Sequence, residues 1–495
     1  MNESVPSDAV VVTPEVSCED FALLKDNDTA GSEGKRIYSV GTLRYTVAGL
    51  VMVSTWLLWG DFCSTVYGIL FGNFLPLYLH GLKASNGLIA FLSSSVGGAA
   101  NILFLPNISM WTDRHRSRWG RRMPFLFWTA PLIALDLVGM GYSSQIGGWL
   151  HGMVVPLHVF SQTQVALAVM SVLVVIAAAL QMVLYNVYQF LLRDVVPQEV
   201  MPWFLTLFRV VGVVAGFLFQ WFFFRYIVEH PQILCAGVGL LFLSSFLLIC
   251  WRVREGNYPP PPPRHAVGVV KNVLVSYRRY FRECMSVGIY RNYVLVFILF
   301  LAGNAAAGTF STLFGIKTLG ISAGEYGRIL ALSTLVSGAV YVLMGYVCKH
   351  WHAVGASMAS LALLAAGQAA VFFLVWNQSG WLVWSLAMAI PTVGWGLASF
   401  VLTMMLFPAE NFGQLSSSLN AIGYGSLLVT GVLIGRFMDF FGGNYRMAFM
   451  ISLVCYTGAL VPMYAVYRGW KRHGGPEHYV PPLPQPYHGG SGTAI

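Results

Sequence analysis

Charged side chains are scarce in this sequence. Of its 495 residues, 10% are Asp, Glu, Lys or Arg and 56% are hydrophobic, and the mean hydropathy is +0.65. A soluble protein carries about 25% charged residues, and one soluble core cannot bury so much apolar side chain, whereas a bilayer can. The composition excludes an ordinary cytosolic enzyme, a disordered protein and a nucleic-acid binder, despite the net charge of +9. It predicts a membrane protein with several spans.

Motifs for catalysis and metal binding are also missing. The seven cysteines are scattered without C-x-x-C or other paired spacing, so we expect buried apolar cysteines rather than disulfides or a zinc site. No H-E-x-x-H or D-x-x-x-D cluster indicates an intramembrane enzyme, and no G-x-x-x-x-G-K-S/T loop indicates an ATP-driven pump. We therefore expect no catalytic residue, no metal and no cofactor. No cleaved signal peptide is expected either, because the N-terminus lacks a basic region followed by a short apolar run.

The acidic residues are concentrated near the N-terminus. Eight of the 20 acids lie in the first 41 positions, together with three bases. Such a polar stretch has too little apolar side chain to form a core, so residues 1–44 are predicted to be a disordered cytoplasmic tail.

Twelve apolar runs are long enough to cross about 30 Å of hydrocarbon as helices. They lie near residues 45–79, 86–110, 124–143, 165–191, 203–225, 232–252, 292–316, 325–348, 353–376, 380–406, 413–438 and 445–468. The predicted fold class is an all-α membrane protein with two six-helix halves, residues 45–252 and 292–468.

A linker, residues 253–291, separates the halves and contains the proline run 259–263. Its arginines and tyrosines predict a basic amphipathic helix at the level of the headgroups rather than contact with nucleic acid. Residues 469–495 are a second tail. Lys and Arg gather in the loops on the side of the linker and the tails, which predicts cytoplasmic termini in a plasma or bacterial inner membrane.

A basic motif lies between the second and third predicted helices. It reads Ser109-x-x-x-Asp113-Arg114-His115-Arg116-Ser117-Arg118-Trp119-Gly120-Arg121-Arg122-Met123-Pro124-Phe125. Together with the six plus six helices, it resembles the loop signature of the major facilitator superfamily. Its S-R-W-G-R-R-x-P-F form is similar to the branch of glycoside–pentoside–hexuronide:cation symporters and sucrose-transporter-like proteins. Further similarity lies in Gly60-Asp61-Phe62, Asp194-Val195-Val196-Pro197, Leu207-Phe208-Arg209-Val210-Val211 and Gly435-x-x-x-Asp439. The resemblance covers residues 45–470 and implies the major facilitator fold.

The motif also suits a mechanical role. An acid at a helix end is held by the dipole of a facing helix and by nearby guanidinium groups. Such a cluster can hold the two halves together on the cytoplasmic side during part of a transport cycle. The predicted conformational latch consists of Asp113, Arg114, Arg118, Gly120, Arg121 and Arg122. The alternative is that these arginines only fix the topology.

Two acids lie within the predicted spans, Asp61 and Asp136. An ionisable residue in mid-helix costs ~2.5–3.5 kcal/mol on insertion scales, so it marks a candidate functional site. Asp61 lies between Trp56 and Tyr67, and a carboxylate with aromatic rings suits a sugar, whose hydroxyls donate and whose apolar face stacks. In the resembled symporters a helix 1 aspartate in G-x-D-F binds the sugar, and Asp61 matches it. We predict that Asp61, Trp56 and Tyr67 bind substrate. A structural aspartate is the alternative.

Other site residues follow from the resemblance. Asn186 falls near the position of the family's helix 4 aspartate, and Arg209 matches the family's helix 5 arginine. We expect Arg209 to pair with Asp61 or with a sugar hydroxyl; a structural role is the alternative. Both Asn186 and Arg209 are predicted to bind substrate. In the second half, Trp395 and Asn420 are predicted to line the cavity, as are Asn304 and Tyr424.

Coupling is predicted to use protons. In the melibiose-type sodium symporters helix 2 carries D-x-x-x-D-P, whereas the stretch here is Asn101-Ile102-Leu103-Phe104-Leu105-Pro106. Because both acids are missing, sodium is a less suitable coupling ion than the proton. Asp61 is the main proton-coupling candidate and Asp136 the second, with a structural hydrogen bond as the alternative for Asp136.

These features predict a secondary active transporter, not an enzyme. Its cargo is expected to be a small neutral solute, a sugar or glycoside, moved by alternating access with proton coupling through Asp61. The alternatives are an uncoupled facilitator, an exporter of another small solute, or a transporter-like solute sensor. The expected partners are the lipid bilayer and the solute, without nucleic acid.

Overall fold

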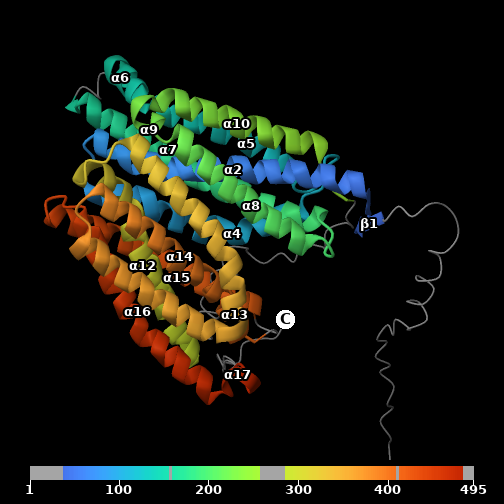
Figure 1. Cartoon of the computed structure of the whole chain (residues 1–495). Helices are drawn as coiled ribbons and strands as arrows, with labels where there is room; N and C mark the ends of the chain where they lie inside the picture. The colour runs from blue at the N-terminus through green and yellow to red at the C-terminus, as the bar shows by residue number, and fades with distance from the viewer. Residues whose placement is uncertain (1–36, 155–158, 257–281, 283–284, 409–411, 483–495) are drawn as a thin grey trace, which may run out of the picture.

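The computed structural model describes residues 37–154, 159–256, 282, 285–408 and 412–482. Within these residues, twelve helices are long and apolar enough to cross a membrane. Each overlaps one of the twelve predicted runs, so the predicted fold class is confirmed (Figure 1). The basic amphipathic helix expected in the linker falls mostly on residues 257–281, outside the described residues.

Six spans form the first half. They are α2 (Val47–Gly81), α3 (Asn86–Ala90) continuing through the π-helical turn η2 (Phe91–Ser95) into α4 (Val96–Arg114), α5 (Met123–Gly141), α7 (Gln162–Val195), α8 (Met201–Leu218) continuing into η4 (Phe219–Phe223), and α10 (Pro231–Arg252). The short helices α6 (Ser143–Met153) and α9 (Tyr226–Glu229) lie in its loops.

Six more spans form the second half. They are α12 (Gly288–Leu313) continuing into η5 (Phe314–Thr318), the two spans of α13 (Ala323–Leu374), α14 (Gln378–Leu406), α15 (Phe412–Phe440) and α16 (Arg446–Arg472). A sharp bend at His352, which has φ of +55°, separates the two spans of α13. The short helix α17 (Gly475–His478) follows α16.

Several helices begin where a side chain satisfies their first N–H groups. Thr46 Oγ1 accepts a hydrogen bond from Gly49 N at 3.2 Å at the start of α2. Ser161 and Gln164 form a reciprocal capping box at the start of α7. Pro76 lies inside α2, which continues to Gly81 instead of ending at the proline.

The structure corrects the predicted boundaries of both tails and of the linker. Residues 37–44, predicted as disordered, belong to an antiparallel hairpin of β1 (Ile37–Val40) and β2 (Leu43–Thr46). Its two-residue turn contains Gly41 with φ of +56°, a conformation that glycine adopts without strain. The predicted linker ends too late, because α12 begins at Gly288, and the predicted C-terminal tail begins too early, because α16 ends at Arg472.

The molecule has two ends. The hairpin and α17 lie toward one end, here called the terminal side, and α6 lies at the other, here called the distal side (Figure 1). Twelve candidate spans lie between the hairpin and α17, so these two elements lie on the same side. That this side is the cytoplasm stays a prediction.

The two halves share a hydrophobic core on the distal side. One cluster of buried side chains fills the first half and continues into Phe310, Phe314, Trp381 and Phe449 of the second half. A separate cluster, which includes Tyr293 and Trp395, fills the terminal part of the second half. The halves are therefore packed together at their distal ends.

A carboxylate near the end of α15 also joins the halves. Asp439 Oδ1 accepts hydrogen bonds from the backbone N and from Nδ2 of Asn86, both at 2.9 Å, and Oδ2 accepts one from Gly87 N at 3.0 Å. The acid thus binds the N-terminus of α3, where the helix dipole favours negative charge. One turn earlier, Gly435 packs so closely on Gly87 that a Cβ at Gly435 would overlap the Gly87 Cα.

Three further hydrogen bonds between the halves lie in the same distal part of the bundle. They run from Thr312 Oγ1 to Asn73 Oδ1 (2.8 Å), from Thr334 Oγ1 to Gln220 Oε1 (2.7 Å) and from Ser95 Oγ to Leu427 O (2.7 Å). Together with the shared core, they define a conformation that is closed on the distal side.

Asp439→Ala should loosen this closure. The change removes an acceptor of three hydrogen bonds at the start of α3, and bonds to charged groups contribute about 1.5–3 kcal/mol each. We expect the amides of Asn86–Ala90 to exchange at least roughly 10-fold faster in hydrogen-exchange mass spectrometry. Glu325→Gln is the matched control, because this distal acid bonds Ser322 at the start of its own helix. Unchanged protection in Asp439→Ala would show that the carboxylate does not hold the halves together.

Candidate functional site

Asp61 is a buried carboxylate about 21 Å along α2. The residue is 7% exposed. Its Oδ2 is buried and has no hydrogen-bond partner among the described residues. The atom faces α8, where a Cβ built on Gly212 would lie 3.7 Å away. An unbonded acid oxygen inside a membrane helix is a site where a proton or a polar ligand would bind.

Arg209 connects Asp61 to the second half. It lies one turn before Gly212 on α8 and interacts electrostatically with the Asp61 carboxylate. Its guanidinium carbon also lies 5.8 Å from the ring centroid of Tyr341 in α13, within the range of a cation–π contact. Asp61, Arg209 and Tyr341 thus form a polar series that passes from the interior of the first half to the second half.

A cavity of about 240 Å³ lies on another side of α2, between α2, α4 and α7. The lining side chains that matter here are Tyr67, Ser93, Asn101, Gln181 and Tyr185. Ser93 Oγ and Gln181 Oε1 are buried and have no hydrogen-bond partner among the described residues. Their unused hydrogen-bonding capacity, beside two tyrosine rings, suits a neutral hydroxylated solute.

The cavity reaches toward the second half through Tyr185. This residue is 50% exposed and lies near Tyr424 of α15. Tyr424 in turn meets the ring of Phe297 edge-on at 6.4 Å. The predicted cavity residue Tyr424 therefore lies near a cavity residue of the first half.

The structure places the predicted substrate residues of the first half in different surroundings. Tyr67 lines the cavity, but Asp61 and Arg209 do not belong to its lining. Asn186 lies next to Tyr185, yet its Nδ2 donates to Met182 O of its own helix at 2.7 Å. Trp56 lies 5.9 Å from the guanidinium of Arg252 at the end of α10. The sequence prediction thus grouped residues that the structure separates.

The predicted residues of the second half are also dispersed. Trp395 is 3% exposed and stacks on Phe300 at 4.7 Å within the core of that half. Asn304 and Asn420 are exposed on α12 and α15. Their assignment to substrate stays a prediction.

Asp136 is the second buried acid of the spans. Its residue is 6% exposed, and Oδ1 has no hydrogen-bond partner among the described residues. Tyr67 and Cys235 are its neighbours: Asp136 and Cys235 both act electrostatically on the Tyr67 phenol. Tyr67 lines the cavity, so Asp136 lies near a residue of the cavity wall. Its role stays a prediction.

The basic motif is tied to the end of α7. Arg121 binds Asp194 with Nη2 at 2.8 Å and 2.9 Å from the two carboxylate oxygens, and Arg122 Nε lies 3.1 Å from Asp194 Oδ2. Arg122 also donates to Thr112 Oγ1 of α4. These contacts join α4, α5 and α7 within the first half, not the two halves. Arg114 and Arg118 are exposed, and the side chain of Asp113 lies outside the described residues. The latch between halves stays a prediction.

Glu255, just after α10, caps the N-terminus of α5. Its carboxylate accepts hydrogen bonds from the backbone N of Arg121, Arg122 and Met123 at 2.8–2.9 Å. Burial raises the pKa of the Glu255 carboxyl, and the three N–H groups oppose that rise. Gly120 is needed here, because it has φ of +108° and a Cβ would lie 2.7 Å from the Glu255 carboxyl carbon. The glycine of the motif therefore makes room for an acid.

Sequence reasoning missed Gln181, Ser93, Glu255 and the partner of Asp439. Gln181 had a detectable signal, since it is one of three amide side chains in a long apolar run, with Asn186 and Gln189. Glu255 had no detectable signal, because it follows the sixth span like any loop acid. Its three partners are backbone N–H groups 132–134 residues earlier in the sequence. Only the packing of α5 against α10 brings them together.

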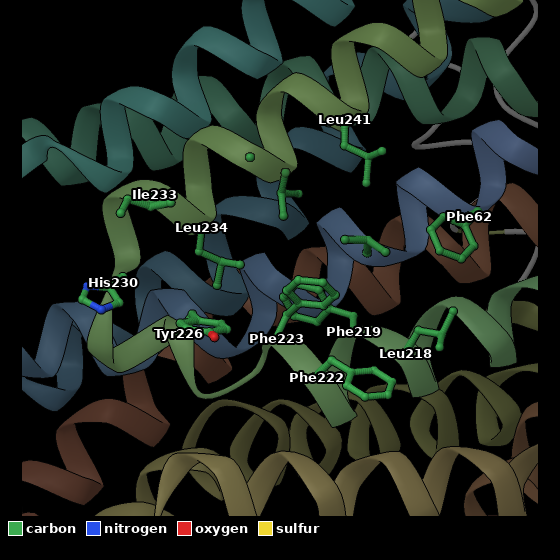
Figure 2. A pocket seen from close by; sticks show the side chains of 13 residues that line it. Phe62, Leu218, Phe219, Phe222, Phe223, Tyr226, His230, Ile233, Leu234 and Leu241 are labelled. Carbon is green, nitrogen blue, oxygen red and sulfur yellow. The ribbon is translucent and has the colours of Figure 1, made fainter.

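A separate apolar groove contains none of the predicted site residues. It has a volume of about 710 Å³ and lies between α2, α10 and the η4 end of α8 (Figure 2). Phe222 and Ile233 on its walls are 55% and 71% exposed. Such an apolar wall on membrane spans is a lipid-facing feature and offers no chemistry for a polar solute.

Glu255→Gln should destabilise the first half. The change removes the charge that three N–H groups and the dipole of α5 stabilise, at a cost of about 1–3 kcal/mol. We expect a lower melting temperature for the purified protein. The control is Glu229→Gln, which removes the charge of an exposed acid at the end of α9 and should leave the melting temperature unchanged. Equal melting temperatures of the two variants would contradict a stabilising role of Glu255.

Comparisons with known proteins give a short sequence match. No protein-family model matches the chain. The chain is similar to the sucrose transport protein SUT1 of Oryza sativa, in both subsp. japonica and subsp. indica, with 33% identity over 75 residues. The match spans 15% of this chain and 14% of the relative's length.

Solved structures match most of the chain. The nucleoside transporter NupG aligns with a TM-score of 0.60 and 9% identity, over 84% of this chain and 100% of the other. A bacterial homologue of the iron transporter ferroportin in the inward-facing state gives 0.59 and 15%, over 84% and 99%. A bacterial homologue of the human lysosomal transporter Spinster gives 0.58 and 12%, over 86% and 97%. The protein therefore has the major facilitator fold, which it shares with these transporters, and its described residues form twelve candidate transmembrane helices in two six-helix halves.

Proposed function

We propose that the protein is a secondary transporter that moves a small neutral solute, a sugar or glycoside, by alternating access, with proton coupling through Asp61. The observation that carries the proposal is the buried Asp61 Oδ2, which has no hydrogen-bond partner among the described residues. The fold and the match to sucrose transport proteins support the transporter class. The unpaired Ser93 and Gln181 groups support a neutral, hydroxylated cargo.

The contacts between the halves supply the conformational part of the proposal. In the present conformation the distal side is closed by the shared core and by Asp439. The same bacterial ferroportin homologue aligns better in its inward-facing state, with a TM-score of 0.59, than in its outward-facing state, with 0.53. Transport requires that the distal contacts open while the terminal ends of the halves approach each other.

Asp61 and Arg209 supply the coupling. While Asp61 is charged, it attracts Arg209 toward the interior of the first half. When Asp61 is protonated, that attraction disappears and Arg209 is available to Tyr341 or to a solute hydroxyl. A single proton thus changes a contact between the halves, which is what coupling to a rocking motion requires. Asp136 behind Tyr67 is the second candidate for the proton.

Asp61→Asn should abolish solute-driven proton movement. Purified protein in proteoliposomes is presented with a panel of disaccharides, glycosides and hexoses, and the external pH is recorded. We expect alkalinisation with at least one sugar, and its loss in Asp61→Asn, because an amide cannot exchange a proton. Asp136→Asn is the matched control: proton uptake that persists there and is lost in Asp61→Asn assigns the coupling to Asp61.

Each other outcome has a defined meaning. Sugar counterflow without proton movement, equal in wild type and Asp61→Asn, would make the protein an uncoupled facilitator. Loss of proton uptake in Asp136→Asn alone would assign the coupling to Asp136 instead of Asp61. No signal from any sugar, with transport of a nucleoside or peptide by the same vesicles, would reject the proposed cargo and keep transport. Binding without movement of any solute would indicate a sensor.

Gln181→Leu should weaken solute binding more than Asn186→Leu. Gln181 Oε1, beside the cavity, has no hydrogen-bond partner in the part of the chain that the structure describes, whereas the Asn186 amide donates to its own helix. Loss of one hydrogen bond to a neutral solute corresponds to about 0.5–1.5 kcal/mol, so KM should rise roughly 3- to 10-fold in Gln181→Leu with little change in Asn186→Leu. A larger rise in KM for Asn186→Leu than for Gln181→Leu would favour Asn186, as predicted from the sequence, as the substrate residue and would argue against the cavity beside Gln181.

A further inference from the structure

A separate groove of about 1000 Å³ lies on the terminal side of the first half. It is bounded by the loop between α4 and α5 and by the end of α10. The side chains important here are Arg118, Trp119, Phe127, Trp251 and Arg254. One wall is basic and the other is aromatic.

The groove lies across the boundary of the membrane spans. Phe127 and Trp251 belong to the candidate spans Met123–Gly141 and Pro231–Arg252, whereas Arg118 and Arg254 lie just outside them. Trp251 is 71% exposed, and exposed tryptophans are typical of the headgroup level of a membrane. The aromatic wall therefore lies at the ends of two candidate spans and the basic wall just beyond them.

Two arginines of the basic wall are available to a ligand, whereas a third lining arginine, Arg121, is paired with Asp194. Among the described residues, Arg118 and Arg254 have neither an ion-pair nor a hydrogen-bond partner. The acid that lines the groove, Glu255, already accepts three backbone N–H bonds. Gly120 and Glu255 also fix the path of the loop, so the groove is formed before any ligand binds.

We propose that this groove binds an anionic phospholipid, with its phosphate between Arg118 and Arg254 and an acyl chain along Phe127 and Trp251. Guanidinium groups form strong, charge-assisted hydrogen bonds with phosphate oxygens, and basic pockets between membrane helices bind anionic headgroups. The lipid would connect the motif loop to the end of α10 and stabilise the frame of the first half. The proposal does not depend on the identity of the transported solute.

The acidic segment 1–36 is the competing occupant. The chain enters the described structure close to the groove, since Thr42 Oγ1 would lie 2.9 Å from a Cβ on Gly256, a lining residue. A phospholipid complements both walls, because its phosphate suits the basic wall and its acyl chain suits the aromatic wall. Phospholipids also surround every membrane span, which favours a lipid over the tail. Occupation by the tail is therefore an outcome of the test.

The test uses the purified full-length protein in detergent. Dioleoyl phosphatidylglycerol, dioleoyl phosphatidylcholine or glycerol phosphate is titrated in, and Tm is measured. We expect phosphatidylglycerol to raise Tm, because a ligand of the folded state stabilises it. The double variant Arg118→Gln/Arg254→Gln should need about 30-fold more lipid for the same rise. Because both side chains are exposed, its Tm without lipid should equal that of the wild type.

Arg114→Gln is the matched control, since Arg114 is an exposed arginine of the same loop that does not line the groove. It should respond to phosphatidylglycerol like the wild type. An equal rise with phosphatidylcholine or glycerol phosphate would overturn the proposal, as would an unchanged response of the double variant. No rise in the wild type would also overturn it and would indicate that another anion, such as the acidic tail, occupies the groove.

Discussion

The hydrocarbon interior has no water to solvate a charge, and this constraint determines what each acid of the protein does. Asp194 and Glu255 lie at the ends of spans, where guanidinium or backbone N–H groups bind their oxygens. Asp61 and Asp136 lie within spans, and each has a buried oxygen without a hydrogen-bond partner among the described residues. The first pair stabilises the fold. The second pair retains the unused capacity that proton transfer or ligand binding needs.

The same chemistry also determines the conformation. Asp439 binds the N-terminus of α3 across the boundary of the halves, and small residues such as Gly435 allow the helices to meet there. These contacts, with the shared hydrophobic core, close the distal side. By contrast, the arginine motif that was expected to link the halves binds Asp194 within the first half. In this conformation, the contacts between the halves lie on the distal side and the contacts of the motif lie on the terminal side.

The two candidate parts of the transport site lie on different sides of α2. Asp61 faces α8 and Arg209, whereas Tyr67 contributes to the cavity with Gln181. One helix thus contacts both the proposed proton site and the proposed solute site. A shift of α2 relative to α8 would change the geometry of both proposed sites. Proton and solute binding can therefore be coupled through α2 without direct contact between them.

The sequence alone determined the fold class, the number of spans and the two buried acids, because hydrophobic length and the penalty for a charge in hydrocarbon are local properties. It could not determine which side chains meet. Trp56, Tyr67 and Asp61 are close in sequence but face α10, the cavity and α8, respectively. The contact of Asp439 with Asn86 joins residues 353 positions apart. Such pairings depend on the rotation and packing of whole helices, which only the tertiary structure decides.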